Sequence, residues 1–407
     1  MPTESAIKSY SFFLFLLFLT TMGCWFAWGT MKTIMLTILG ICLILSAIIG
    51  GIKFVFSRKN ILLCAVFYIA FITVSLSFSI RIFFTQLPYY LIPTICVVCV
   101  GNNIKQYALS YITKWFAYLL ISSFIVYVFS FWIGSSPLES ISPNMETRGP
   151  YDNFLLYVRP VISHTDFRRF NGPFIESGHL GMMSAFLLFA NRFDFKKIEN
   201  IIIGFILLAS FSLAGYILAF IGFFFVRYHQ GKTKLLNLIM YVMLVGGFYF
   251  IGQYYNNGDN LINEKILSRL EYDEEKGITG NNRVSLYQME LYAQMYNDPT
   301  LLLMGYSQET QDALEDDLEH GNGYQLYFIR HGLIGTLVAF AFYILSLLFA
   351  KDQKYAFLFL IFVILCFLQR TYPFWLSWII CYDYAIRTRD KEIKESLLAT
   401  KYKKLLK

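Results

Sequence analysis

Charged side chains are scarce in this sequence. Asp, Glu, Lys and Arg make up 15% of its 407 residues, whereas soluble domains carry about 25%. Hydrophobic residues make up 57% instead, and apolar stretches of about 20 residues, long enough to cross a bilayer, recur along the whole chain. The composition excludes an ordinary soluble domain and predicts an all-α protein with many membrane-spanning helices.

Cysteine is absent from the long polar segments. All seven cysteines lie in apolar stretches, so we expect neither a disulfide bond nor a zinc site. Cys96 and Cys99 form a C-x-x-C pair, but one such pair alone is more typical of small packing residues than of a redox or metal site. The acidic run at 315–319 likewise favours a solvated helix face over a metal site. We therefore expect no metal and no other cofactor.

The net charge of +7 has no soluble basic domain to carry it, so it does not indicate nucleic-acid binding. It is a topology signal, because cytoplasmic loops are enriched in Lys and Arg. The connections after the first and third expected spans hold only Lys32 and Arg81. Those after the second and fourth hold Lys53, Arg58, Lys59 and Lys105. This bias places the amino terminus in the cytoplasm, and the basic tail beyond residue 387 follows it there.

Two long polar segments interrupt the spans. The loop at 134–172 contains four prolines, so we expect it to be irregular or broken into short elements. The segment at 252–323 is far too long for a turn. In order, the expected regions are spans at 1–133, the first loop at 134–172, membrane segments at 173–251, the large loop at 252–323, and spans with a basic tail at 324–407.

The apolar stretch at 201–226 has a small and polar centre, Ser210–Gly215. As one helix it would place Arg227, Lys232 and Lys234 outside, against the charge bias. We therefore predict a hairpin of two short helices that enters the membrane partway, each half about 18 Å long at 1.5 Å per residue. The chain then has about 12 membrane segments, with both termini cytoplasmic and both long loops periplasmic.

Helices are expected within the large loop. Asn282 is a candidate N-cap, and Arg283, Tyr287 and Glu290 then share one helix face. A second helix is expected at 307–321. A guanidinium at a helix start suits phosphate oxygens, because the helix N-terminus adds positive field. Arg283 is therefore a candidate ligand of a lipid phosphate, although a single loop arginine is more often only solvated.

Ionisable residues surround the expected start of the sixth span. Arg168 and Arg169 precede the Gly172–Pro173 turn, and Glu176 and His179 lie one turn apart beyond it. Ionisable groups that point into a membrane helix are energetically unfavourable and by default mark a functional cavity. The alternative is snorkelling of the arginines at the interface, with a structural Glu–Arg pair.

A further candidate set lies where the large loop returns to the membrane. His320, Asn322 and Tyr324 precede an apolar span, and histidine titrates near neutral pH as a general base must. The alternative is a turn that needs the neighbouring glycines. Arg370 separates two late spans and is either a cavity arginine or an interfacial anchor.

The order of these motifs resembles the O-antigen polymerase and ligase superfamily, which contains the Wzy polymerases and the WaaL ligases. An R-x-x-G-x-x-x-E element opens a mid-chain span, a broken apolar pair follows, and a long loop carries an N-R-x-x-x-[YW] helix. The family often has His directly before the Asn of the loop exit, where this sequence has Gly321 and His320 lies one residue earlier. The matching residues are Arg169, Gly172, Glu176, Arg283, Tyr287, Pro299, Gly305, Asn322, Tyr324, Gly332 and Gly335.

The resemblance implies a GT-C-like glycosyltransferase that needs no metal and acts on undecaprenyl-pyrophosphate-linked oligosaccharides in the bacterial inner membrane. It implies that Arg169 and Arg283 stabilise the leaving diphosphate, and that Glu176 or His320 takes the acceptor proton. The residues expected to bind substrate are Arg168, His179, Tyr287, Asn322, Tyr324 and Arg370.

Polymerisation of repeat units is the expected activity, with a chain-length-determining co-polymerase as a candidate partner. A ligase that transfers the glycan to the lipid A core is the nearest alternative. A flippase for lipid-linked oligosaccharides is an alternative of another class, although transporters often show internal symmetry that is not evident here.

Overall fold

The computed structural model describes residues 2–78, 90–132, 136–143, 149–161, 169–231 and 323–387, and, within 246–310, residues 246–247, 249–258, 260, 263, 267, 272–273, 277–278, 286–307 and 310. The described chain is mostly helical, with short strands in the two long polar segments. This result confirms the helical class that the composition predicts.

The first part of the chain forms the long helices α1 (Glu4–Thr21), α2 (Thr30–Ile49), α3 (Arg58–Phe78) and α5 (Asn102–Trp132). α1 begins after Thr3, whose hydroxyl accepts a hydrogen bond from the Ala6 amide at 3.2 Å, as an N-cap residue does. The 3-10 turn η1 (Trp25–Ala27) and Gly29, at φ +58°, then reverse the chain into α2.

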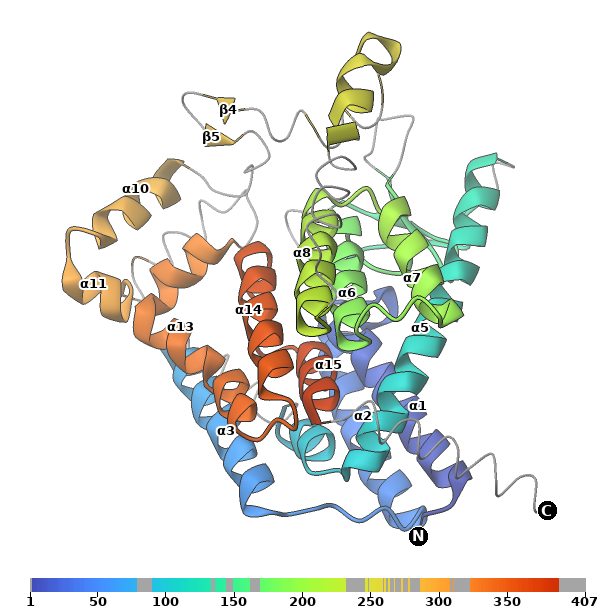
Figure 1. Ribbon diagram of the computed structural model, residues 1–407, viewed down its shortest axis with the longest axis vertical. Helices are drawn as coiled ribbons and strands as arrows, with labels where there is room; N and C mark the ends of the chain where they lie inside the picture. Colours follow the sequence, from blue (N-terminus) through green and yellow to red (C-terminus); the bar gives the residue numbers. More distant parts are fainter. Residues whose placement is uncertain are drawn as a thin grey trace.

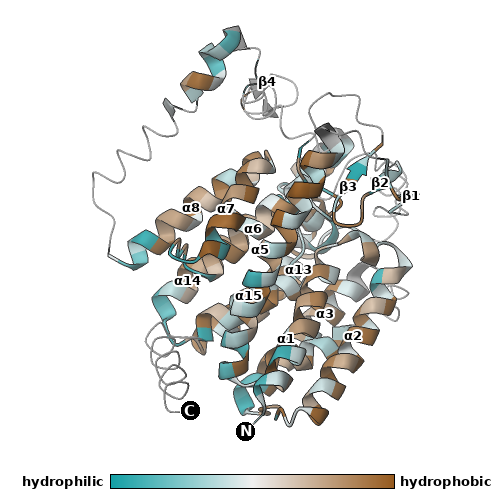
Figure 2. Ribbon diagram, turned by 90° about the vertical axis from the view of Figure 1, so that its right-hand side faces the viewer, coloured by the Kyte–Doolittle hydropathy of each residue, from teal (hydrophilic) through white to brown (hydrophobic). Residues whose placement is uncertain are grey.

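The later helices are α6 (Ser177–Ala190), α7 (Ile198–Ala209), α8 (Leu213–His229), α10 (Leu286–Met295), α11 (Pro299–Met304), α13 (Tyr324–Leu348), α14 (Gln353–Gln369) and α15 (Leu376–Arg387). Among the described helices, α2, α3, α5 and α13 are long and apolar enough to cross a membrane, and α6, α7, α8 and α14 are shorter apolar helices. Figure 2 shows hydrophobic residues dominating α7 and α8. The number of about 12 membrane segments stays a prediction, because stretches such as 79–89 and 232–245 lie outside the described residues.

Basic connections gather at one end of the molecule, which we call the basic end. The Val55 amide donates to the Cys99 carbonyl at 2.6 Å, and the Lys351 amide donates to the Ile386 carbonyl at 3.2 Å. These bonds tie together connections that are far apart in the sequence. The basic residues of these connections include Lys53, Arg58, Lys59, Arg192 and Lys351.

The opposite end, which we call the loop end, carries the described segments 136–143 and 149–161 and the start of α13. In Figure 1 the start of α1 lies at the bottom, and α10 and the short strands β4 (Tyr272–Asp273) and β5 (Gly277–Ile278) lie toward the top. The 3-10 turn η2 (Tyr255–Gly258) precedes these strands. The charge bias in the sequence therefore corresponds to a spatial separation of the basic connections from the long polar segments.

The break predicted in the apolar stretch 201–226 is confirmed. α7 and α8 are separated at Ser210–Ser212, and the Ser212 hydroxyl caps α8 by accepting the Gly215 amide at 3.2 Å. A Cβ atom on Gly215 would lie 3.0 Å from the Cα of Gly181, so α6 and α8 pack backbone against backbone here. α8 returns to the basic end, where His229 Nε2 lies 2.8 Å from the carboxylate of the α14 N-cap residue.

The proline-rich loop at 134–172 is broken into short elements, as expected. Strands β1 (Glu139–Ile141), β2 (Tyr151–Asn153) and β3 (Val158–Pro160) form an antiparallel sheet in the order β1-β2-β3. The Trp25 indole donates to the Leu155 carbonyl at 2.7 Å and so connects the turn after α1 to this sheet. The sheet thereby forms part of the loop end.

The large loop packs onto α13 through a glycine contact. α10 ends before Asp298, whose carboxylate caps a separate short helix, α11, that the sequence did not lead us to expect. α11 ends at Gly305, and a Cβ atom on Gly332 would lie 2.6 Å from the Gly305 nitrogen. Gly332 itself, at φ +59°, kinks α13. The predicted N-cap Asn282 and most of the predicted helix 307–321 lie outside the described residues.

Candidate active site

An ion pair joins two of the predicted site residues. Glu176 is the N-cap residue of α6, and Arg370 follows the last residue of α14. The Arg370 Nη2 atom contacts the Glu176 Oε2 atom, although the two residues are 194 positions apart. The side chain of Arg370 is 5% exposed and that of Glu176 is 21% exposed, so the pair lies just beneath the surface of the loop end.

The loop after Arg370 brings aromatic rings to the same place. The rings of Tyr372 and Trp375 stack with their centres 4.0 Å apart. The predicted His179, on the first turn of α6, meets both rings edge-on at 5.7 and 5.5 Å. These contacts place His179 against the 370–375 loop, and its role in substrate binding stays a prediction.

Arg169 lies at the break between α7 and α8. Its Nη2 atom donates to the Phe211 carbonyl, and its charge lies close to Tyr216 on α8. Phe211 has φ +46°, a conformation that turns the chain at the break. Two features predicted separately, the upstream arginine and the broken apolar pair, thus meet in space, and Gly181 of α6 contacts Ser212 beside them.

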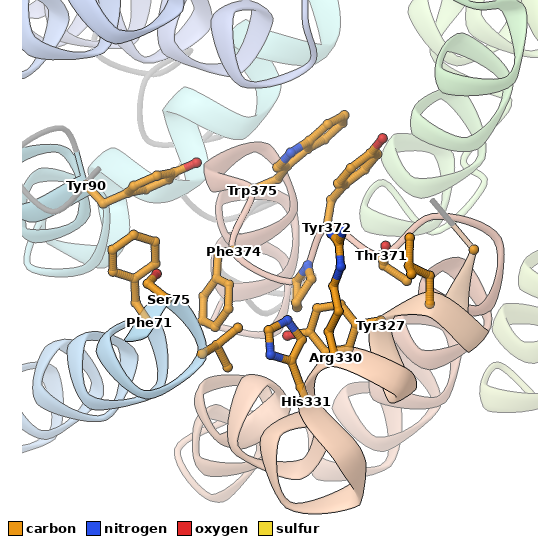
Figure 3. Close-up of a pocket in the computed structure, with 14 residues that line it drawn as sticks. Phe71, Ser75, Tyr90, Tyr327, Arg330, His331, Thr371, Tyr372, Phe374 and Trp375 are labelled. Atoms are coloured by element: carbon orange, nitrogen blue, oxygen red, sulfur yellow. The ribbon is translucent and has the colours of Figure 1, made fainter. Parts of the chain in front are cut away.

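A cavity of about 260 Å³ begins at Thr371, the residue that follows Arg370, and is slightly smaller than typical pockets for small molecules. Its walls come from α3, α13 and the loop that follows Arg370. Figure 3 shows Arg330 and His331 rising from α13 toward this loop. The lining combines aromatic faces with polar groups and includes Phe71, Ser75, Tyr90, Tyr327, Tyr372 and Trp375.

Arg330 and His331 are site residues that the sequence reasoning missed. They lie within the span that begins at Tyr324, seven residues or fewer into it. The available signal was a pair of ionisable residues inside an apolar stretch, which marks a functional cavity in the same way as Glu176 does. The sequence marks Lys32 only as a topology signal, but its ammonium lies 5.7 Å from the centre of a Trp375 ring.

Several predicted residues cannot be placed against this site. Arg168, Arg283, His320 and Asn322 lie outside the described residues. The convergence of Arg169 with Arg283 on one diphosphate therefore stays a prediction.

Two predicted tyrosines are described. Tyr287 lies on α10 and is 38% exposed. Tyr324 is the first residue of α13, with its ring 6.3 Å from that of Tyr292. Burial raises the pKa of Tyr292 above that of an exposed tyrosine.

A second charged cluster lies at the basic end, and we call it the buried ion cluster. The Lys105 ammonium donates to the Val98 carbonyl at 2.7 Å and to the Asp383 carboxylate at 2.6 Å. Arg387 donates to the same carboxylate at 2.6 Å and to the Asn60 side chain at 3.2 Å. Lys105 was expected in a solvated connection, but it lies in the first turn of α5 and is fully buried.

No family model, curated protein or solved structure matches this chain. The case for a function therefore rests on the motifs and on the chemistry that the described residues bring together at the loop end.

Proposed function

We propose that the protein is an O-antigen polymerase, a metal-independent glycosyltransferase that joins undecaprenyl-pyrophosphate-linked repeat units at the periplasmic face of the bacterial inner membrane. The loop end is then periplasmic, the basic end and both termini are cytoplasmic, and about 12 segments lie in the membrane. The observation that carries the proposal is the contact of Arg370 with Glu176 beside a cavity that Arg330 and His331 line.

The proposed reaction transfers a glycan from one lipid carrier to the sugar of another. The acceptor hydroxyl oxygen forms a bond to the anomeric carbon of the donor glycan as the bond from that carbon to the phosphate oxygen breaks. The carrier diphosphate leaves with the electron pair, and a basic side chain takes the hydroxyl proton.

Arginine is suited to the charge that develops on the leaving group, because its planar fork donates two parallel hydrogen bonds to phosphate oxygens. In the proposed site Arg330 lines the cavity and Arg370 adjoins it, and both join the predicted Arg169 and Arg283 in stabilising the diphosphate. Glu176 and His320 are the candidates for the base.

The nearest alternative is a ligase, which uses the same donor but transfers the glycan to the lipid A core. The proposed diphosphate site serves both reactions equally well, so the acceptor distinguishes them. A flippase remains the alternative of another class. It would need the diphosphate to pass to the opposite face, and the buried ion cluster occupies the space between α5 and α15 at that end.

Deletion of the gene in its own strain, followed by a gel of the lipopolysaccharide, tests the proposal. A polymerase is indicated when the ladder is lost and a single repeat remains on the core, whereas loss of every repeat indicates a ligase or a flippase. An unchanged ladder overturns the proposal.

Complementation with arginine variants tests the site in the same strain. Arg330→Ala and Arg283→Ala are expected to lose the ladder while the protein still accumulates in membranes. Arg58→Ala, which removes an exposed arginine at the basic end, is the matched control and is expected to restore the full ladder. Full laddering with Arg330→Ala and Arg283→Ala would remove both residues from the site.

A further inference from the structure

Aromatic rings continue outward from the cavity along α13 and α10. Tyr327 lines the cavity, and Tyr324 lies about one helical turn earlier, beside the cavity-lining Gly323. The ring of Tyr292 lies 6.3 Å from that of Tyr324, and the ring of Tyr296 lies 5.5 Å from that of Tyr292. We call Tyr324, Tyr292 and Tyr296 the tyrosine row.

Apolar packing holds the tyrosine row in place. Leu291 and Met295 of α10 are buried against Leu326 and Ile329 of α13. Beside them, the Tyr306 hydroxyl donates to the Leu291 carbonyl at 3.0 Å. The contact between α11 and the kink of α13 fixes the other end of this unit. The backbone that carries the tyrosines is therefore held by a packed helix pair, so little backbone ordering is needed when a ligand binds.

The row becomes more exposed with distance from the cavity. Tyr296 is 66% exposed, whereas Tyr292 and Tyr324 are partly buried. The Tyr296 hydroxyl donates to the Tyr292 hydroxyl at 3.2 Å. Each tyrosine has an apolar ring face and a polar edge. Exposed aromatic side chains that continue a cavity lining are typical of a binding surface rather than of a solvated helix.

A glycan matches this surface chemically. A sugar ring has faces of C–H bonds that pack on aromatic rings and a rim of hydroxyls that accept and donate hydrogen bonds. Tyrosine offers both kinds of contact with only two side-chain torsions to fix. α10 also offers the amide of Gln294, whose oxygen lies 3.3 Å from the Tyr306 hydroxyl.

We propose that the tyrosine row binds sugar residues of the growing glycan beyond the ring that reacts, and that this binding sets how many repeats are added before release. The inference rests on the proposed function, because it assumes that a glycan occupies the cavity. It assigns a chain-length role to residues of the polymerase itself.

Tyr296→Ala tests the inference, because Tyr296 is largely exposed and its removal leaves the α10–α13 packing intact. The full-length protein, in lipid nanodiscs, is titrated with polysaccharide that mild acid has released from the lipopolysaccharide of the same strain. We expect Tyr296→Ala to bind the polysaccharide roughly three- to tenfold more weakly, because about one aromatic contact is lost. In the deletion strain the same variant is expected to give a ladder of shorter modal length with the first repeats still present.

Two further variants give the controls. Tyr296→Phe keeps the ring face and is expected to retain most of the binding and the wild-type modal length. Tyr228→Ala removes a tyrosine that is 50% exposed at the basic end and is expected to change neither readout. A similar effect of Tyr228→Ala and Tyr296→Ala would overturn the proposal, because the effect would then not depend on the row.

The outcomes also separate this inference from the proposed function. If the wild-type gene restores no ladder in the deletion strain, the proposed function fails. If it restores the ladder and Tyr296→Ala keeps both the modal length and the binding, only the tyrosine row is overturned. If chains shorten while polysaccharide binding stays at the wild-type level, the row contacts another protein, and the proposal of a glycan surface is overturned.

Discussion

The two charged clusters of this protein use the same types of side chain in opposite surroundings. In the buried ion cluster the side chains of Lys105 and Asp383 are both 0% exposed. At the loop end the side chain of Glu176 is 21% exposed. It pairs with Arg370, and the loop that follows Arg370 lines a cavity. The Lys105–Asp383 pair is thus fully buried, and the Glu176–Arg370 pair lies near a cavity.

The difference in burial separates a charged cluster that stabilises the fold from one that can interact with a ligand. A buried carboxylate that accepts from both Lys105 and Arg387 holds α5 and α15 together, and it leaves no room for a ligand oxygen. An arginine beside a cavity can exchange or share its partner when a diphosphate arrives. A function can thus be assigned to an ionisable group within an apolar helix only when its surroundings are known.

Asp383→Asn is expected to have the largest effect, and the effect should be on folding. Without the carboxylate, Lys105 and Arg387 keep buried charges that lose their counter-ion, which costs about 3–5 kcal/mol. Thermal unfolding in detergent, followed by size-exclusion chromatography, measures the loss. The pair Lys105→Met with Asp383→Leu is expected to recover part of it, because apolar residues often replace a buried ion pair without loss. Wild-type melting of Asp383→Asn would show that the cluster is not structural.

Arg370→Ala is expected to affect activity more than stability. The variant removes the guanidinium that pairs with Glu176, and Glu176 is partly solvated and can be hydrated in its place. Removal of one preorganised donor to a developing negative charge lowers a rate by about 10²–10³-fold. The rate of ladder formation from lipid-linked repeat units measures this. Arg370→Lys keeps the positive charge but loses the planar guanidinium that donates two parallel hydrogen bonds. It is therefore expected to recover only part of the wild-type rate. An unchanged rate of ladder formation with Arg370→Ala would show that Arg370 only anchors α14 and takes no part in the reaction.

Local features of the fold could be predicted from the sequence. Apolar length predicts the spans, and the polar centre at Ser210–Gly215 predicts the break, because small polar residues are unfavourable in mid-membrane. The prolines of the first loop predict its short elements. Each of these predictions uses only neighbouring residues.

Pairings between distant helices could not be predicted in this way. Glu176 and Arg370 were both named, but nothing in the sequence shows that α6 and α14 bring them together. Lys105 was assigned to a connection because the partner that buries it, Asp383, lies 278 residues away. Arg330 and His331 could have been singled out as ionisable residues inside an apolar stretch, but the loop that faces them across the cavity could not be predicted.

Gly332→Ala is expected to weaken the loop end without touching the buried ion cluster. At φ +59° a side chain is strained, and the added Cβ would lie 2.4 Å from the Leu303 carbonyl oxygen. We expect a loss of about 1–3 kcal/mol, which separates α11 from α13 and exposes the chain near Gly305 to protease. Gly247→Ala, where a Cβ meets open space, is the control and should leave the cleavage pattern unchanged. Equal protection of both variants would show that the glycine contact does not hold this segment.

The smallest expected effect compares two similar contacts at the two ends. Lys32 lies 5.7 Å from the centre of a Trp375 ring at the cavity, and Lys59 lies 5.4 Å from the Phe349 ring at the basic end. A cation–π contact of this kind contributes about 0.5–1 kcal/mol, so the two lysines matter about equally to stability. They differ in function, because Trp375 lines the cavity and Phe349 does not belong to its lining. Lys32→Met is expected to lower the rate of ladder formation by about two- to fivefold, while Lys59→Met leaves the rate unchanged. Equal rates for the two variants would mean that the ring of Trp375 keeps its place without the lysine, and that the cation at the cavity rim serves only to anchor α2.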